Sequence, residues 1–141
     1  MAIPRHLRLE FVTPERAIVH EDVDEVVIPG EEGEFGVLPG HAPLLAALRT
    51  GVLWYRKGAE KTYAFVDGGF AEVLPDRVAI LAQVAERAEE IDVQRAEAAM
   101  RRAEEQLARP GPADVDYERI RLALLKSVAR LQVSRYTRSR S

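Results

Sequence analysis

The chain has 141 residues, of which 47% are hydrophobic and 30% charged, the usual balance of a soluble globular protein. It contains no cysteine, which excludes disulfides, thiolate nucleophiles and cysteine metal clusters. No apolar run approaches the roughly 20 residues of a membrane-spanning helix and the N-terminus lacks the apolar core of a secretory signal, so we expect a cytoplasmic protein that reaches a membrane only through a partner.

The formal net charge of −3 is unevenly distributed. Residues 1–90 carry 16 acidic and 9 basic side chains, whereas residues 119–141 carry only basic ones: Arg119, Arg121, Lys126, Arg130, Arg135, Arg138 and Arg140. A basic tail suits an acidic partner surface. The preference of cations for helix C-termini is an alternative, but it covers only about one turn. Nucleic-acid binding is disfavoured, since the body is acidic and only one aromatic residue lies among these cations.

The first 85 or so residues are predicted to form strands. Leu7, Leu9 and Phe11 alternate with polar residues, as in a half-buried strand. Turn signals then separate further short segments at 17–19, 23–28 and 35–38, a hairpin of 51–55 with 62–66, and a second hairpin of 71–74 with 78–82. Many short strands of this kind indicate a sandwich or a barrel.

From Asp92 the hydrophobic period becomes helical. One helix is predicted at 92–108, with Asp92 as its N-cap and a narrow stripe made mostly of alanine. A second is predicted at 115–134, beginning near Asp114 or Asp116, with a stripe of Tyr117, Ile120, Leu124, Val128 and Leu131. The Pro/Gly link at 109–112 makes the two helices antiparallel neighbours, and residues 136–141 are expected to fray. The predicted domains are therefore a β domain at 1–86 and a helical hairpin at 87–141.

The sequence offers no catalytic or metal-binding motif. The glycines of 30–36 lie among three carboxylates, which would repel phosphate, and His6, His20 and His41 lack metal-ligand spacing. No serine stands in a nucleophile elbow, and adjacent carboxylates such as Glu89 and Glu90 are typical of solvated loops. We therefore predict no catalytic residue and no metal site.

Three blocks resemble one known family. VIPGEEGEFGVLPGHAPLL at 27–45, GGFAEV at 68–73 and AERAEEID at 85–92 are similar to the epsilon subunit of F-type ATP synthases, in the order in which that family has them. The resemblance covers essentially the whole chain. It implies an α+β, mainly β fold: an N-terminal two-sheet β-sandwich of about ten strands, followed by an antiparallel two-helix hairpin.

The resemblance also implies a non-catalytic coupling and regulatory role in a proton-translocating ATP synthase at the cytoplasmic face of the bacterial membrane. The sandwich is expected to join the gamma subunit to the membrane-embedded c-ring. By family pattern, Glu31, Glu32, Gly33 and Glu34 face the c-ring and His41 faces gamma. An ordinary acidic turn and a structural loop histidine remain the alternatives for these residues.

In this family the hairpin either folds onto the sandwich or extends into the catalytic head of alpha and beta subunits, where it inhibits ATP hydrolysis. By hypothesis Arg119, Arg121, Lys126 and Arg130 carry the inhibitory contact with beta, since beta has an acidic segment in this family. A switch of this kind needs two states only a few kcal/mol apart.

Some bacterial members bind ATP in the folded hairpin through an I/L-D-x-x-R-A motif, which stands here as Ile91 to Ala96. Positions that match the ATP-binding residues are Glu86, Asp92, Arg95, Arg102, Lys126 and Arg130. Lys126 replaces a family arginine and lacks its bidentate fork. No cofactor is required, and ATP would be regulatory. Asp92 also has a purely structural interpretation as a helix cap, and a stand-alone ATP sensor is the alternative function.

Overall fold

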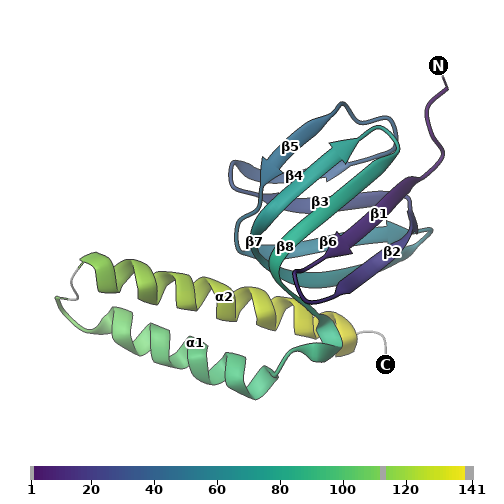
Figure 1. The fold of residues 1–141 in the computed structure, drawn as a ribbon. Helices are drawn as coiled ribbons and strands as arrows, with labels where there is room; N and C mark the ends of the chain where they lie inside the picture. Colours follow the sequence, from purple (N-terminus) through teal and green to yellow (C-terminus); the bar gives the residue numbers. More distant parts are fainter. Residues whose placement is uncertain (1, 112–113, 139–141) are drawn as a thin grey trace.

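The computed structural model describes residues 2–111 and 114–138. Its strands are β1 Leu7–Val12, β2 Ala17–Val23, β3 Glu25–Gly30, β4 Gly33–Val37, β5 Leu44–Ala47, β6 Gly51–Lys57, β7 Glu60–Leu74 and β8 Arg77–Arg87. A short 3-10 helix, η1 Ala88–Glu90, leads into α1 Val93–Ala108 and α2 Asp114–Arg138 (Figure 1). Pro112 of the predicted link and residues 139–141 of the predicted tail lie outside the described residues. No helix in the described part is long and apolar enough to cross a membrane.

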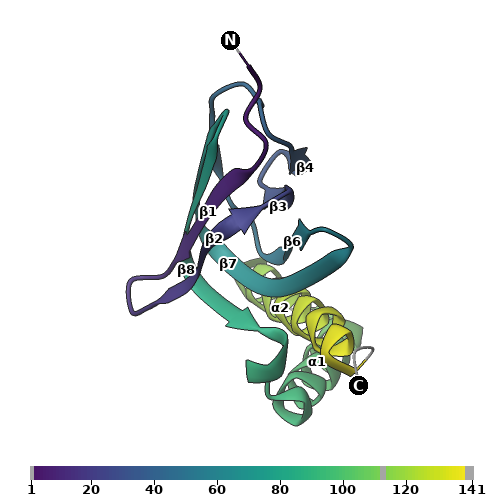
Figure 2. The ribbon, with the colours of Figure 1, turned by 90° about the vertical axis from the view of Figure 1, so that its right-hand side faces the viewer.

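The strands form two layers that share β7 and β8. One layer has the order β2-β1-β8-β7-β5 and the other β4-β3-β6-β7-β8, because the two ends of each long strand have different neighbours. β1 runs parallel to β8, and the other pairings are antiparallel. Figure 2 shows β1 and β2 on one side and β3, β4 and β6 on the other, joined through β7. The predicted α+β class, with a sandwich before a helical hairpin, is confirmed.

The two layers enclose the main hydrophobic core. β1 alternates as its sequence predicts, with Leu7, Leu9 and Phe11 all at 0% exposure. Val26, Ile28, Leu53 and Val66 approach from the opposite layer and are equally buried. Burying apolar area at about 25 cal/mol per Å² makes this core the main source of sandwich stability.

Eight continuous strands are found where about ten were expected, because β7 and β8 each take part in both layers. Segments 62–66 and 71–74 both belong to β7, which pairs with β8 in one unbroken antiparallel register. The strand passes from one layer to the other at Gly68 and Gly69, whose φ angles are +72° and +114°. At Gly69 a Cβ would lie 2.0 Å from the Leu81 carbonyl oxygen, so only glycine fits this bend.

The helical hairpin forms as predicted, but α2 is not covered along a single stripe. Tyr117 and Val128 are 46% and 37% exposed, while Ala129 and Val133 are buried against Phe65 and Ile91. The prediction was wrong at these two positions because α2 packs on α1 along one side and on β6 and β7 along another. A helix between two partners buries two stripes, which its sequence period does not resolve.

Tyr136 corrects a second expectation. Instead of belonging to a frayed tail, it lies within α2, and its ring stacks on Tyr63 of β7 with centroids 3.4 Å apart and planes within 4°. The C-terminal part of α2 is thus ordered by contact with the sandwich.

Candidate functional site

A cavity of about 480 Å³ lies between α1, α2 and the segment that follows β8. We call it the hairpin cavity. All six residues predicted to bind ATP line it: Glu86, Asp92, Arg95, Arg102, Lys126 and Arg130. The remaining lining is Glu90, the alanines 96, 98, 99 and 123, and Ser127. The fold therefore brings together six residues that span 45 positions of the sequence. Whether they bind nucleotide stays a prediction.

Arg130 is held by the sandwich side of this cavity. Its Nε and Nη2 donate to the two carboxylate oxygens of Glu86, at 3.0 and 2.9 Å, and its guanidinium lies 4.4 Å from the ring centroid of Phe65. A bidentate pair over an aromatic face is the geometry that arginine favours. Glu86 and Arg130 thus fix α2 to the end of β8.

Lys126, one turn earlier on α2, is held by a different strand. Its Nζ lies 3.3 Å from Oδ2 of Asp67 on β7. The other oxygen of Asp67 accepts a hydrogen bond of 2.6 Å from the hydroxyl of Thr50. Asp67 therefore has both oxygens engaged, one from within the sandwich and one from the hairpin.

The α1 side of the cavity is less constrained. Asp92 caps α1 by accepting a 3.1 Å hydrogen bond from the backbone N–H of Arg95, as predicted. The side chains of Arg95 and Arg102, by contrast, have no hydrogen bond or ion pair within the part of the chain that is described. Four cations and three carboxylates line the cavity, and two of the cations have no partner there, so the site has capacity for an anion.

The segment that leads into the hairpin is anchored to the sandwich by Glu90. Its carboxylate accepts hydrogen bonds from Nη1 and Nη2 of Arg16, which lies in the turn between β1 and β2. It also accepts one of 2.8 Å from the backbone N–H of Arg87. The Arg16 hydrogen bond lowers the pKa of the Glu90 carboxyl and raises that of Arg16. Arg87 in turn donates to the carbonyl of Ile18. Glu90 therefore ties the segment before α1 to the β1–β2 turn of the sandwich.

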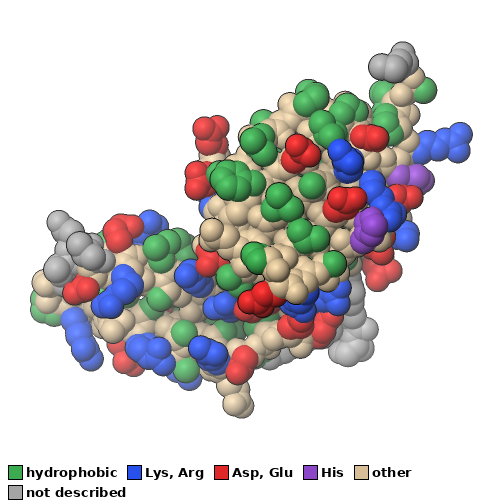
Figure 3. Space-filling model, viewed as in Figure 1, with side chains coloured by type: hydrophobic (Ala, Val, Ile, Leu, Met, Phe, Trp, Pro, Cys, Tyr) green, Lys and Arg blue, Asp and Glu red, His purple; other side chains and the backbone are tan. Residues whose placement is uncertain are grey.

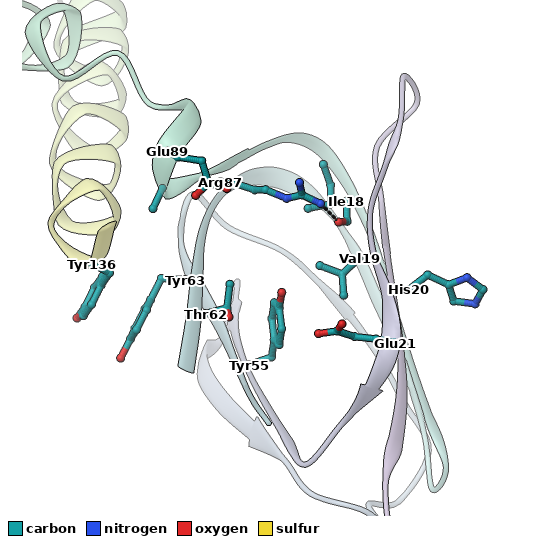
Figure 4. A pocket seen from close by; sticks show the side chains of 11 residues that line it. Ile18, Val19, His20, Glu21, Tyr55, Thr62, Tyr63, Arg87, Glu89 and Tyr136 are labelled. Carbon is teal, nitrogen blue, oxygen red and sulfur yellow. Dashed lines mark hydrogen bonds between the residues drawn. The ribbon is translucent and has the colours of Figure 1, made fainter. Parts of the chain in front are cut away.

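Near the C-terminal end of α2, aromatic rings make a further contact with the sandwich. Figure 4 shows Tyr136 beside Tyr63 at one side of a pocket that Tyr55, Glu21 and Arg87 also line. Trp54 also lies near Tyr63, with ring centroids 6.2 Å apart. Two ion pairs, the aromatic stack and the burial of Ala129 and Val133 against Phe65 thus hold α2 against the sandwich.

The predicted c-ring and gamma residues lie on loops of the sandwich and not at the cavity. Glu31 and Glu32 form the tight turn between β3 and β4, Gly33 and Glu34 begin β4, and the three carboxylates are exposed. Glu31 is fixed by its backbone N–H, which donates to Ala47 at 2.9 Å. His41, between β4 and β5, makes a 2.7 Å contact from Nδ1 to the Ala42 carbonyl. These assignments stay predictions.

The four cations predicted to inhibit hydrolysis fall into two pairs. Arg119 and Arg121 are exposed, and within the described residues their ion pairs are the i,i+3 contacts with Asp116 at 3.2 Å and Glu118 at 3.1 Å. Lys126 and Arg130 bind the sandwich instead. The folded hairpin therefore leaves only the first pair available to another protein.

The sandwich also exposes several large apolar side chains. Figure 3 shows apolar side chains spread over the sandwich surface that faces the viewer, with the charged helical hairpin below it. The most exposed of those on β5, β7 and β8 are Leu45 at 70% and Phe70 and Leu81 at 54% each. Grouped apolar residues on a soluble protein are typical of a protein contact.

Sequence reasoning missed Arg16, Thr50, Asp67 and the pairing of Tyr63 with Tyr136. Arg16 and Glu90 are 74 positions apart and belong to no shared motif. For Asp67 the sequence signal is its position directly before the GGFAEV block at 68–73.

Fold and cavity together define a class of small two-part protein, a β-sandwich whose appended helical hairpin encloses a cationic cavity. Residues 6–88 match the family described as ATP synthase, Delta/Epsilon chain, beta-sandwich domain, and residues 89–135 match its long alpha-helix domain. The chain belongs to this ATP synthase delta/epsilon family.

Similar proteins include the ATP synthase epsilon chain of Syntrophobacter fumaroxidans, 51% identical over 93% of this chain and 97% of that one. The epsilon chain of Solibacter usitatus is 50% identical over 92% and 96%. Among solved structures, one chain of the Euglena gracilis mitochondrial ATP synthase, OSCP/F1/c-ring, superposes with a TM-score of 0.80 at 28% identity, covering 92% of this chain and 81% of that one. A chain of the Tetrahymena thermophila central stalk and c-ring shares the fold, with a TM-score of 0.62 at 11% identity.

Proposed function

We propose that this chain is the rotor epsilon subunit of a bacterial F-type ATP synthase, which joins gamma to the c-ring at the cytoplasmic face of the membrane. The observation that carries the proposal is the match to both family domains, in order, across residues 6–135. The similar Euglena chain comes from an assembly whose title names F1 and the c-ring. The exposed apolar group on β5, β7 and β8 and the rigid acidic turn at Glu31 suit two different protein contacts.

Co-purification tests this role. A tagged chain expressed in a bacterium that lacks its own epsilon subunit should bring down gamma and the c-ring from detergent-solubilised membranes. Leu81→Asp, which places a charge in the apolar group, should reduce recovery of gamma, while Leu122→Asp on the hairpin should not. A tagged chain that recovers neither subunit, and remains in the soluble fraction, would favour a stand-alone sensor.

The hairpin is proposed to inhibit ATP hydrolysis when it leaves the sandwich, through Arg119, Arg121, Lys126 and Arg130. Lys126 and Arg130 also hold the folded state, so replacing all four mixes two effects. Arg119→Ala with Arg121→Ala separates them, because the ion pairs that these side chains make among the described residues lie within α2. The double variant should relieve inhibition in the reassembled enzyme, with Arg101→Ala and Arg109→Ala on the other side of the link as the charge-matched control. Unchanged hydrolysis would remove Arg119 and Arg121 from the inhibitory contact.

ATP is the proposed ligand of the hairpin cavity and would stabilise the folded hairpin. The unpartnered Arg95 and Arg102 side chains and the 480 Å³ volume support an anionic ligand of nucleotide size. Titration calorimetry of the isolated chain should show ATP binding that Arg95→Ala with Arg102→Ala abolishes. Absence of heat at millimolar ATP would refute it.

A further inference from the structure

We propose that Asp67 of the sandwich competes with the ligand phosphates for Lys126 and thereby sets the affinity of the hairpin cavity for a nucleoside triphosphate or another polyphosphate. This inference rests on the proposed nucleotide role of the cavity. It assigns a regulatory, positioning function to a residue that neither lines the cavity nor belongs to the nucleotide motif.

The first argument is the division of the cavity cations. Arg95 and Arg102 on α1 have no partner within the described residues, but Lys126 on α2 lies 3.3 Å from the Asp67 carboxylate. A phosphate that approaches the cavity therefore meets two available charges on α1 and one on α2 that is already neutralised. To gain Lys126, the ligand must take it from Asp67.

The second argument is that Asp67 is built to stay in place. Thr50, in the loop between β5 and β6, donates a 2.6 Å hydrogen bond to Oδ1 and leaves Oδ2 for Lys126. Asp67 directly precedes the bend of β7 at Gly68 and Gly69, where two positive φ angles set the course of the backbone and so the position of Asp67. Its side chain is only 25% exposed, against 41% for Lys126. The carboxylate is the fixed partner and the lysine is the one that can move.

The third argument concerns the lysine itself. An arginine at this position could keep one N–H on Asp67 and offer others to phosphate through its planar fork, whereas lysine is a single point charge. With lysine in place of arginine at position 126, binding to Asp67 and binding to phosphate therefore exclude each other more strongly. Arg130 faces a similar carboxylate in Glu86, but Glu86 lines the cavity and already belongs to the predicted ligand set.

The test is titration calorimetry of the full chain with ATP, tripolyphosphate and adenosine. Asp67→Asn keeps the shape and can still accept from Thr50, so the fold should survive, but it releases Lys126. Exposed ion pairs are worth little, which corresponds to a gain in ATP affinity of about two- to fivefold. Tripolyphosphate should show the same gain and adenosine none. Thr50→Val, which loosens Asp67, should produce a smaller gain in the same direction.

Two controls isolate the competition. Asp76→Asn removes a sandwich carboxylate at the other end of β8 from Glu86, and so reproduces the change in net charge without touching Lys126. Lys126→Ala should abolish the effect of Asp67→Asn, so that the double variant binds like Lys126→Ala alone. A structural role of Asp67 in holding α2 would instead weaken binding.

The outcomes separate this inference from the proposed function. If the wild-type chain binds ATP and Asp67→Asn binds equally or more weakly, the inference is overturned and the ATP site stands. An equal gain with Asp76→Asn, or a gain with adenosine, also overturns it. Binding by Asp67→Asn alone supports the inference and shows that the wild-type cavity is blocked by its own carboxylate. If neither binds any phosphate ligand, both proposals fail.

Discussion

Replacing Tyr136 with alanine should release the C-terminal half of α2 from the sandwich. The Tyr136 residue is 38% exposed, so about three-fifths of a side chain that buries about 150–250 Å² when fully covered lies against Tyr63 and its neighbours. At about 25 cal/mol per Å², and reduced because reference areas are upper bounds, the loss is about 2–3 kcal/mol. The ratio of folded to open hairpin should fall about 30- to 150-fold.

Hydrogen exchange measures this equilibrium directly. Backbone amides of α2 near Val133 should lose about 2–3 kcal/mol of protection, whereas amides of β1 should be unchanged. Trp54, the only tryptophan, lies 6.2 Å from Tyr63 and should report the opening through its fluorescence. Tyr136→Phe keeps the stacked ring and should lose less protection than Tyr136→Ala.

Tyr117 is the control for helix propensity, because it is a tyrosine near the start of the same helix but is not the tyrosine that stacks on Tyr63. If Tyr117→Ala and Tyr136→Ala change α2 protection equally, helix propensity explains the result and the stack does not hold the hairpin. Unchanged protection in Tyr136→Ala would refute the reasoning outright.

Three further predictions concern Glu90 before the hairpin, the bend of β7 at Gly69 and the N-cap of α1 at Asp92. Because its bond to Arg16 lowers the pKa of Glu90, the stability that this carboxylate contributes is present above the ordinary carboxyl pKa and is lost as pH falls through the lowered value. Urea midpoints of the wild type and Glu90→Gln should therefore differ at pH 7 and converge on acidification; a constant gap would contradict this. Gly69→Ala should destabilise the sandwich by more than about 3 kcal/mol in urea unfolding, because its Cβ would lie 2.0 Å from a backbone oxygen, while Gly58→Ala, with open space at φ +61°, should cost about 1 kcal/mol. Similar costs would refute the steric argument. Asp92→Ala should reduce the stability of α1 by about 1 kcal/mol in hydrogen exchange, and Asp92→Ser should restore it because serine also caps helices. A loss of ATP binding that persists in Asp92→Ser would then show that the carboxylate itself contacts the ligand.

The proposed ATP site and the contact of the sandwich with α2 share the same two side chains. Lys126 and Arg130 are ion-paired to Asp67 and Glu86 in the folded state, and both were predicted to meet ligand or the beta subunit. When ligand and sandwich compete for the same side chain, a change in ligand concentration can shift the equilibrium between the folded and open hairpin. Measurements on either residue must therefore separate docking from binding.

Much of the architecture follows from local sequence. The alternation of Leu7, Leu9 and Phe11 places one face of β1 in the core, and Asp92 marks the start of α1 as the predicted cap. The period of two in the first part and of 3.6 in the second separates sandwich from hairpin, because these periods decide which side chains share a face. The candidate ATP residues, named through resemblance to a family motif, line one cavity, and their binding of ATP stays a prediction.

Only the tertiary structure decided which distant residues meet. Gly68 and Gly69 turned two predicted strands into one, and α2 buried Ala129 and Val133 in place of Tyr117 and Val128. The partners of Lys126 and Tyr136 lie on β7, more than 50 positions away, and depend on how the hairpin docks. Periodicity and turn chemistry act between sequence neighbours and so determine the elements. The pairing of side chains across the hairpin–sandwich contact depends on the relative placement of packed elements, which no local pattern encodes.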